Sequence, residues 1–200
     1  MRGKKARAAR RLHSLQRAAV KEGADFELWY ADATRFDLLP VTRSMWRRRG
    51  SRLALQTPGT NVRVGVVGAI GYPHQNCLFT HQPQRVTAEL VPPLVRKLVA
   101  RARRTGKRIV LVVDNGRPFD TRLARASFEA ASAWVRPFVL PHYSSETLNW
   151  IEGFWEQLKS TYFSRMLTPR REDFYPATVR LLRHLQRPRR HASLVLPAPP

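Results

Sequence analysis

Apolar and polar residues alternate along residues 26–36, which is the pattern of a β-strand with one buried face. Phe26, Leu28 and Tyr30 fall on one face of this strand, and the period of two places Asp32 on the same face. We therefore expect a carboxylate to stand on the buried side of the first strand.

The rest of the pattern predicts an α/β domain with a mixed central sheet flanked by helices. Five consecutive apolar residues before Asp114 are typical of a central strand covered on both faces. β-branched runs on either side of Gly71 and Pro73 predict a hairpin. In chain order, the expected elements are a strand over 26–36, a hairpin over 62–70 and 76–80, a helix over 86–104 that stops at Gly106, a strand over 108–114, a helix over 120–133 capped by Asp120 or Thr121, a strand over 134–140, a helix from Thr147 onward and a helix over 173–186.

The two ends of the chain differ in composition from the middle. Residues 1–22 are rich in Ala and Arg, and we expect a basic arm that offers no core and is either helical or disordered until it meets phosphate. Residues 23–190 form the expected folded domain, and residues 191–200 form a flexible, proline-rich tail. No uncharged apolar stretch of about 18 residues occurs, so we expect no membrane partner.

The charge balance points to a polyanionic partner. The chain carries 36 Lys and Arg against 14 Asp and Glu, a net charge of +22, and nucleic acid is the commonest partner of such a protein. The single cysteine, Cys77, excludes an internal disulfide and a cysteine-rich zinc site, which fits a reducing cytosol. The absence of a Gly-rich phosphate-binding loop argues against a nucleoside triphosphatase.

Three acids stand out against this positive charge. Asp32 and Asp114 end strands and Glu152 lies on a following helix, so all three can face the crevice where α/β sheets bind ligands. Carboxylates suit Mg²⁺ or Mn²⁺, and two such ions about 4 Å apart would activate a water or a 3′-hydroxyl and stabilise the leaving oxygen. The trio thus predicts phosphodiester hydrolysis or strand transfer. Taken singly, each aspartate could equally end a turn, and Glu152 could be an ordinary exposed helix position.

The sequence around these acids resembles a known family. Residues 140–159, LPHYSSETLNWIEGFWEQLK, closely resemble the third-acid segment of mariner-related bacterial insertion-sequence transposases, the insertion sequence family six-thirty. The usual form of that segment is L-P-x-Y-S-P-x-L-N-P-I-E-x-x-W-x-x-L-K. VVDNGRP resembles the second-acid segment and WYADATRF the first. The 37 residues between Asp114 and Glu152 are typical of the group, and the resemblance extends from about Glu27 to Gln186.

The resemblance implies an RNase H-like fold and a DDE transposase that cleaves DNA and transfers strands at transposon ends. It implies that Asp32, Asp114 and Glu152 form the catalytic trio that binds Mg²⁺ or Mn²⁺, with two ions in the site. The other site residues expected are Asn115 and Asn149 in supporting roles, with Arg35, Arg47, Arg48 and Arg117 as contacts to DNA phosphates.

The resemblance also implies partners and a location. Transposases of this kind carry an N-terminal helix-turn-helix module, whereas only 31 residues precede Asp32. We therefore expect a separate helix-turn-helix polypeptide, together with DNA at transposon ends and targets and a second copy of this chain in a homodimer. Residues 1–22 would be an interdomain linker or a phosphate-binding arm, and the protein would work in the bacterial cytoplasm on the nucleoid.

Three positions depart from the family pattern. Ala33 stands where Glu is usual, Phe119 lies where a His is common, and Trp150 replaces a Pro. None of these changes removes a metal ligand. They leave two alternatives open: an inactive, DNA-binding remnant of a transposase, and a cellular nuclease of the same RNase H-like fold.

Overall fold

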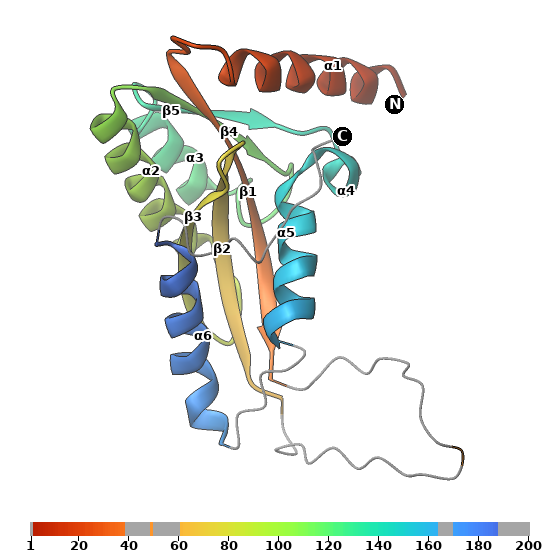
Figure 1. The fold of residues 1–200 in the computed structure, drawn as a ribbon, viewed down its shortest axis with the longest axis vertical. Helices are drawn as coiled ribbons and strands as arrows, with labels where there is room; N and C mark the ends of the chain where they lie inside the picture. The colour runs from red at the N-terminus through yellow and green to blue at the C-terminus, as the bar shows by residue number, and fades with distance from the viewer. Residues whose placement is uncertain (1, 39–48, 50–60, 164–169, 188–200) are drawn as a thin grey trace.

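One mixed sheet of five strands forms the centre of the protein. The structure is a computed structural model that describes residues 2–38, 49, 61–163 and 170–187. The strands follow the order β3-β2-β1-β4-β5, and the central strand pairs with β2 in the antiparallel and with β4 in the parallel sense (Figure 1). The strands are β1 (Phe26–Asp37), β2 (Arg63–Tyr72), β3 (Asn76–Pro83), β4 (Arg108–Val113) and β5 (Val135–Val139). The predicted mixed sheet and the predicted β2–β3 hairpin are both confirmed.

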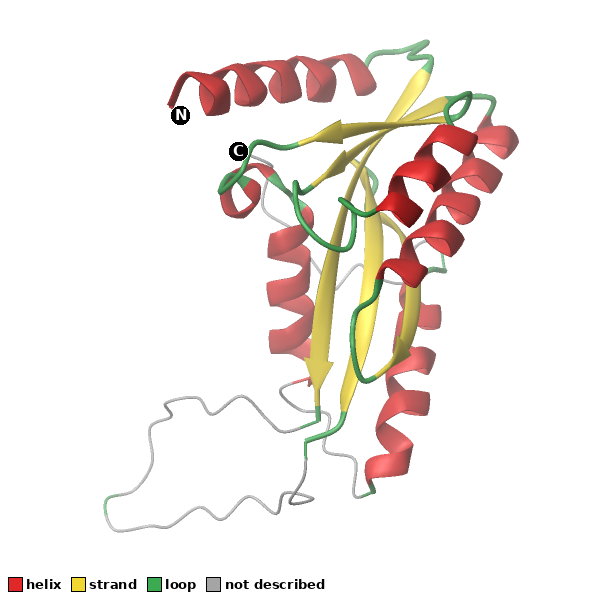
Figure 2. Ribbon diagram, turned by 180° about the vertical axis from the view of Figure 1, so that it is seen from behind, coloured by secondary structure: helices red, strands yellow, loops and turns green. Residues whose placement is uncertain are grey.

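Helices cover both faces of this sheet. Figure 1 looks onto the face covered by α5 and α6, and Figure 2 looks onto the opposite face, which α2 and α3 cover. Helix α1 lies across one end of the sheet, at the top of both views. The helical segments are α1 (Arg2–Ala19), η1 (Ala88–Leu90), α2 (Val91–Thr105), α3 (Arg122–Ala130), α4 (Ser145–Leu148), α5 (Ile151–Leu158), η2 (Lys159–Phe163) and α6 (Arg171–Leu185).

The period of two in β1 divides the core into two layers. Leu28, Tyr30 and Phe36 pack with α5 and α6, whereas Trp29 and Ala31 pack with α2 and α3. Asp32 follows the first set by the same alternation, as the sequence predicted. Its side of the sheet is the side that α5 covers.

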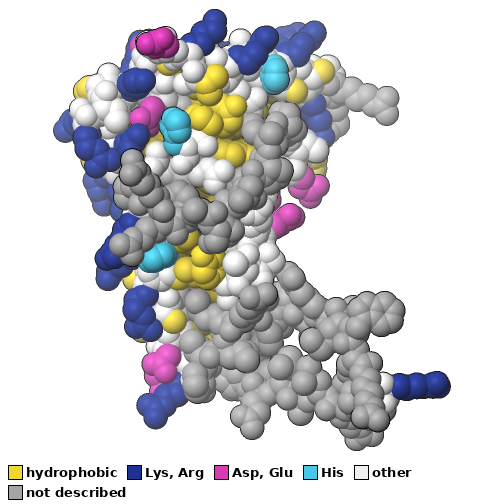
Figure 3. Space-filling model, viewed as in Figure 1, with side chains coloured by type: hydrophobic (Ala, Val, Ile, Leu, Met, Phe, Trp, Pro, Cys, Tyr) yellow, Lys and Arg dark blue, Asp and Glu magenta, His cyan; other side chains and the backbone are white. Residues whose placement is uncertain are grey.

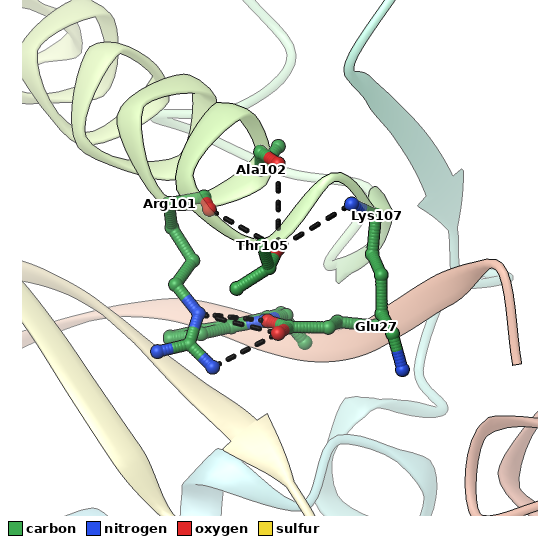
Figure 4. Close-up of polar contacts among 6 residues, drawn as sticks. Glu27, Arg101, Ala102, Thr105 and Lys107 are labelled. Atoms are coloured by element: carbon green, nitrogen blue, oxygen red, sulfur yellow. Dashed lines mark hydrogen bonds and ion pairs between the residues drawn. The ribbon is translucent and has the colours of Figure 1, made fainter. Parts of the chain in front are cut away.

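An ion pair fastens α2 to β1 on the other face (Figure 4). Arg101 of α2 donates to Glu27 of β1 through Nε and Nη2, with a shortest distance of 2.9 Å, and Trp29 Nε1 donates to the same carboxylate at 2.8 Å. One turn later Thr105 Oγ1 donates to the Arg101 carbonyl, and Gly106 ends the helix at a φ of 70°. Glycine adopts this left-handed conformation without strain, which confirms the predicted stop.

We expect Glu27→Ala to lower the free energy of unfolding by about 1–3 kcal/mol, because Arg101 and the Trp29 N–H would both lose their partner. Urea denaturation measures this change. The matched control is Asp25→Ala, whose pair with Arg108 is at least two-thirds exposed and should contribute little. Equal losses in the two variants would contradict this account of the pair.

The prediction that residues 1–22 offer no core is wrong. Helix α1 packs on the sheet, where the Leu12 side chain is 3% exposed and Gln16 Nε2 donates to the Tyr30 hydroxyl at 2.8 Å. The Arg11 guanidinium lies 5.6 Å from the Phe138 ring centroid. Contacts with distant parts of the chain decide where the helix lies, so its own sequence could not show the docking.

Among the described helices, none is long and apolar enough to cross a bilayer.

Candidate active site

Two of the three acids lie where β1 and β4 part. Their parallel pairing runs as far as Tyr30 and Val112, and two residues further along each chain lie Asp32 and Asp114. β4 ends at this point, whereas β1 continues to Asp37 beside β2. The far half of β1 therefore has one edge without a described strand, and both aspartates stand at the start of that open edge.

The third acid is brought to β1 by a break in the helix. The expected continuous helix from Thr147 is wrong, because Asn149 adopts an extended conformation between α4 and α5. Asn149 Nδ2 donates to the Ala31 carbonyl at 3.1 Å, and the Asn149 carbonyl accepts from the Glu152 N–H at 3.0 Å. This bond between distant residues fixes the first turn of α5 next to the residue that precedes Asp32. The side chain of Asn149 thus connects the segment before α5 to the backbone of β1.

The Asp114 carboxylate lies close enough to raise the pKa of both Asp32 and Glu152. Burial, the main cause, and the carboxylates of Glu152 and Asp114 together raise the pKa of Asp32 to about 7, against the opposing effect of the N–H groups of Ala33 and Trp155. Burial also raises the pKa of Glu152, with Asp114 the largest contributor among the charges around it. The site therefore concentrates negative charge in a chain of net charge +22.

This donor set fits a hydrated Mg²⁺ or Mn²⁺ ion. Hard oxygen ligands and mutual repulsion between carboxylates both favour a divalent cation. Within the described part of the chain, no three Asp, Glu, His or Cys side chains lie close enough together to hold a metal ion as they stand. The Asp114 carboxylate is turned toward its own loop, where Oδ1 accepts from the Asn115 N–H at 2.7 Å. Mg²⁺ needs no closed protein cage, since it commonly binds one or two carboxylates and keeps waters or substrate phosphates.

Asn115 joins the loop after β4 to the loop after β5. Its Nδ2 lies 3.1 Å from His142 Nε2, so Asn115 makes a contact beyond its own turn. The spacing of His142 in the chain does not predict a metal ligand, because no second histidine stands at a metal-ligand spacing from it. The His142 imidazole thus contacts the residue that follows Asp114 in the chain.

Arginines surround a pocket beside Asp32. A pocket of about 550 Å³ is lined by Arg35, Arg85 and Arg117 together with the two residues that follow Asp32. Arg35 forms an ion pair with Asp37 at 3.3 Å, whereas Arg85 and Arg117 form none with the described residues. The sequence had predicted Arg35 and Arg117 as DNA contacts and had missed Arg85. The predicted Arg47 and Arg48 lie outside the described residues.

Arg85 could not be found from the sequence because it stands apart from other basic residues: the nearest ones along the chain are Arg63 and Arg96. It lies in the connection from β3 to η1, and only the sheet brings that connection next to β1. On the surface, Lys and Arg side chains gather over α1 and along the edge formed by α2 and α6 (Figure 3). The pocket arginines thus belong to a molecule whose surface is basic on several sides.

The fold is that of a transposase catalytic domain. Solved structures similar to this chain include the Mos1 mariner paired-end complex with Mn (TM-score 0.61, 14% identity, covering 90% of this chain and 55% of that chain). The paired-end complex with Mg is also similar (TM-score 0.60, 12% identity, 90% and 54% covered). The catalytic domain of Mos1 alone gives a TM-score of 0.53 at 12% identity, with 90% and 81% covered. The predicted RNase H-like fold is confirmed, and the chain spans about half the length of the chains in the Mos1 complexes.

Residues 27–174 match the family model of the DDE superfamily endonucleases, and the chain belongs to this family. No curated protein sequence matches the chain. The matched range contains Asp32, Asp114 and Glu152.

Proposed function

We propose that this chain is the catalytic part of a transposase of the insertion sequence family six-thirty, which cleaves DNA at transposon ends and joins the ends to a target. The observation that carries the proposal is that Asp32 of β1, Asp114 at the end of β4 and Glu152 at the start of α5 lie close enough for their charges to interact, in a strongly basic DDE endonuclease. The three segments that resemble the family six-thirty motifs support the finer assignment.

In the proposed reaction, Asp32 and Asp114 hold two Mg²⁺ or Mn²⁺ ions from the strand ends and Glu152 completes the site from α5. When bound, such ions activate the attacking water or 3′-hydroxyl and stabilise the leaving oxygen. The protein's own task is to place the three carboxylates. Asn149 does so by fixing α5 to β1, and Asn115 holds the Asp114 carboxylate through its N–H.

We propose that the arginine-lined pocket binds a DNA strand. Arg85 and Arg117 line this pocket together with Ala33, Thr34 and Arg35, the residues of β1 that follow Asp32. Guanidinium groups bind phosphate oxygens in a bidentate manner, so they would hold the backbone next to the phosphodiester that reacts. Arg35, Arg47 and Arg48 are proposed as further phosphate contacts.

We expect the double variant Arg85→Gln/Arg117→Gln to bind DNA more weakly, by a similar factor for unrelated sequences. Each lost phosphate contact lowers the slope of log K against log salt by about 0.9, so the slope should fall by about 2. Fluorescence anisotropy at several salt concentrations measures this slope. The matched control is Arg103→Gln/Arg104→Gln, which removes the same charge from the exposed last turn of α2. A control that changes the slope equally would contradict the pocket assignment.

Incubation of the chain with supercoiled plasmid in Mn²⁺ tests the proposed function. The expected products are nicked and joined DNA, and both should be lost with a chelator. Salt-dependent binding without nicking would favour the inactive remnant, and nicking that never yields joined strands would favour a cellular nuclease. The proposal includes a separate helix-turn-helix polypeptide, a homodimer and a place on the bacterial nucleoid.

A further inference from the structure

Trp155 is an aromatic residue that lies near two of the three acids, Glu152 in its own helix and Asp32 on the sheet below it. It follows Glu152 by three residues in α5, so both side chains lie on neighbouring positions of one helix face. The side chain is 3% exposed and packs in the core between the sheet and α5, the helix that lies on this face in Figure 1. The helical spacing of Trp155 from Ile151 and Leu158 predicts a core residue, which the burial confirms.

The ring of Trp155 packs on a glycine of the sheet, Gly68. Gly68 of β2 is the direct cross-strand partner of Asp32. A Cβ atom at Gly68 would lie 2.6 Å from Trp155 Cη2 and 2.8 Å from Cζ2, closer than carbon atoms can approach. The absence of a side chain at Gly68 thus lets the indole rest on the sheet directly beside the strand position of Asp32.

The polar end of the same ring has no hydrogen-bond partner. Trp155 Nε1 is fully buried and makes no hydrogen bond with any described residue. The ring stands on Gly68, the direct cross-strand partner of Asp32, so the carboxylate of Asp32 is the neighbouring acceptor on this face of β1. A buried N–H without an acceptor is unfavourable, and a hydrogen bond to that carboxylate would remove the cost.

We propose that Trp155 is a positioning residue of the metal site: its indole N–H, seated by Gly68, donates to one oxygen of Asp32 and leaves the other oxygen directed at the cation. This inference rests on the proposed function, since it concerns how Asp32 meets its ion. Groups that orient a ligating carboxylate in this way typically contribute 10–100-fold to metal affinity.

The test is Mn²⁺ binding to Trp155→Phe, measured by calorimetry without DNA. Phenylalanine keeps an aromatic ring over Gly68 and removes only the N–H. We expect the Kd for Mn²⁺ to rise by about 10–100-fold. The melting temperature of the metal-free chain should stay unchanged or rise, because an unpaired buried donor is removed.

Trp29→Phe is the matched control. Trp29 is equally buried in β1, and its Nε1 donates to Glu27 on the opposite face of the sheet. This variant should keep the wild-type Kd for Mn²⁺ and lose stability. The two variants are thus expected to give opposite patterns of metal affinity and stability.

Two results would overturn the inference. A purely structural role predicts that Trp155→Phe loses stability and binds Mn²⁺ with wild-type affinity, which would contradict the positioning role alone. A wild-type chain that binds no Mn²⁺, or whose binding survives Asp32→Asn, would instead contradict the proposed function and this inference with it.

Discussion

Asp114→Asn is expected to abolish Mn²⁺-dependent DNA cleavage and to leave DNA binding intact. Asparagine has the shape of aspartate but lacks the charge that holds a divalent cation at the end of β4. Bound metal ions contribute several kcal/mol to stabilising the transition state, so the cleavage rate should fall by about a thousandfold or more. Plasmid nicking measures the rate, and anisotropy measures the binding.

Asp120→Asn is the control for this prediction. Asp120 lies in the same loop, is exposed and pairs with Arg125, outside the trio. Its neutralisation removes the same charge and should leave cleavage unchanged. Cleavage by Asp114→Asn at the wild-type rate would contradict the assignment of Asp114 to the catalytic site.

The second large effect concerns stability in the absence of divalent ions. Because the pKa of Asp32 is about 7 in the folded protein and near 3.9 in an unfolded chain, the folded state prefers the protonated carboxyl. The contribution of Asp32 is therefore fully present below about pH 4 and is lost as the pH rises through about 7. The expected loss is on the order of 4 kcal/mol between these limits.

Urea denaturation from pH 4 to pH 8 in chelator measures this loss. Asp32→Asn carries no titrating group at this position, so its free energy of unfolding should exceed that of the wild type increasingly as the pH rises. Mg²⁺ should restore the wild-type stability above pH 7, since the ion binds the deprotonated carboxylates of the folded state. Parallel pH profiles of the two proteins without metal would contradict the electrostatic account of the site.

Local pattern was enough to predict the parts of the site that stand on strands. The alternation in β1 placed Asp32 on the correct face, and the apolar run of β4 placed Asp114 at a strand end. Both signals depend on residues adjacent in the chain. The helical periodicity around Glu152 likewise placed its helix but did not show the break at Asn149, because the bond that compensates it is to Ala31, 118 residues away.

The features that local sequence could not show all depend on contacts between distant elements. Arg85 enters the pocket only because β3 pairs with β2, the neighbour of β1, and η1 follows β3. Leu12 is buried only because α1 docks on the sheet. Trp155 could be assigned to the core from its spacing, whereas its unpaired N–H and its seat on Gly68 become visible only when α5 lies against β2.

The central claim is that Asp32, Asp114 and Glu152 share divalent cations. Anomalous diffraction from crystals of the chain soaked in Mn²⁺ tests it directly. The account predicts Mn²⁺ peaks within bonding distance of the carboxylate oxygens of Asp32 and Asp114, with Glu152 in the same cluster. Peaks bound elsewhere, or a trio that stays free of Mn²⁺ at concentrations that support cleavage, would contradict it.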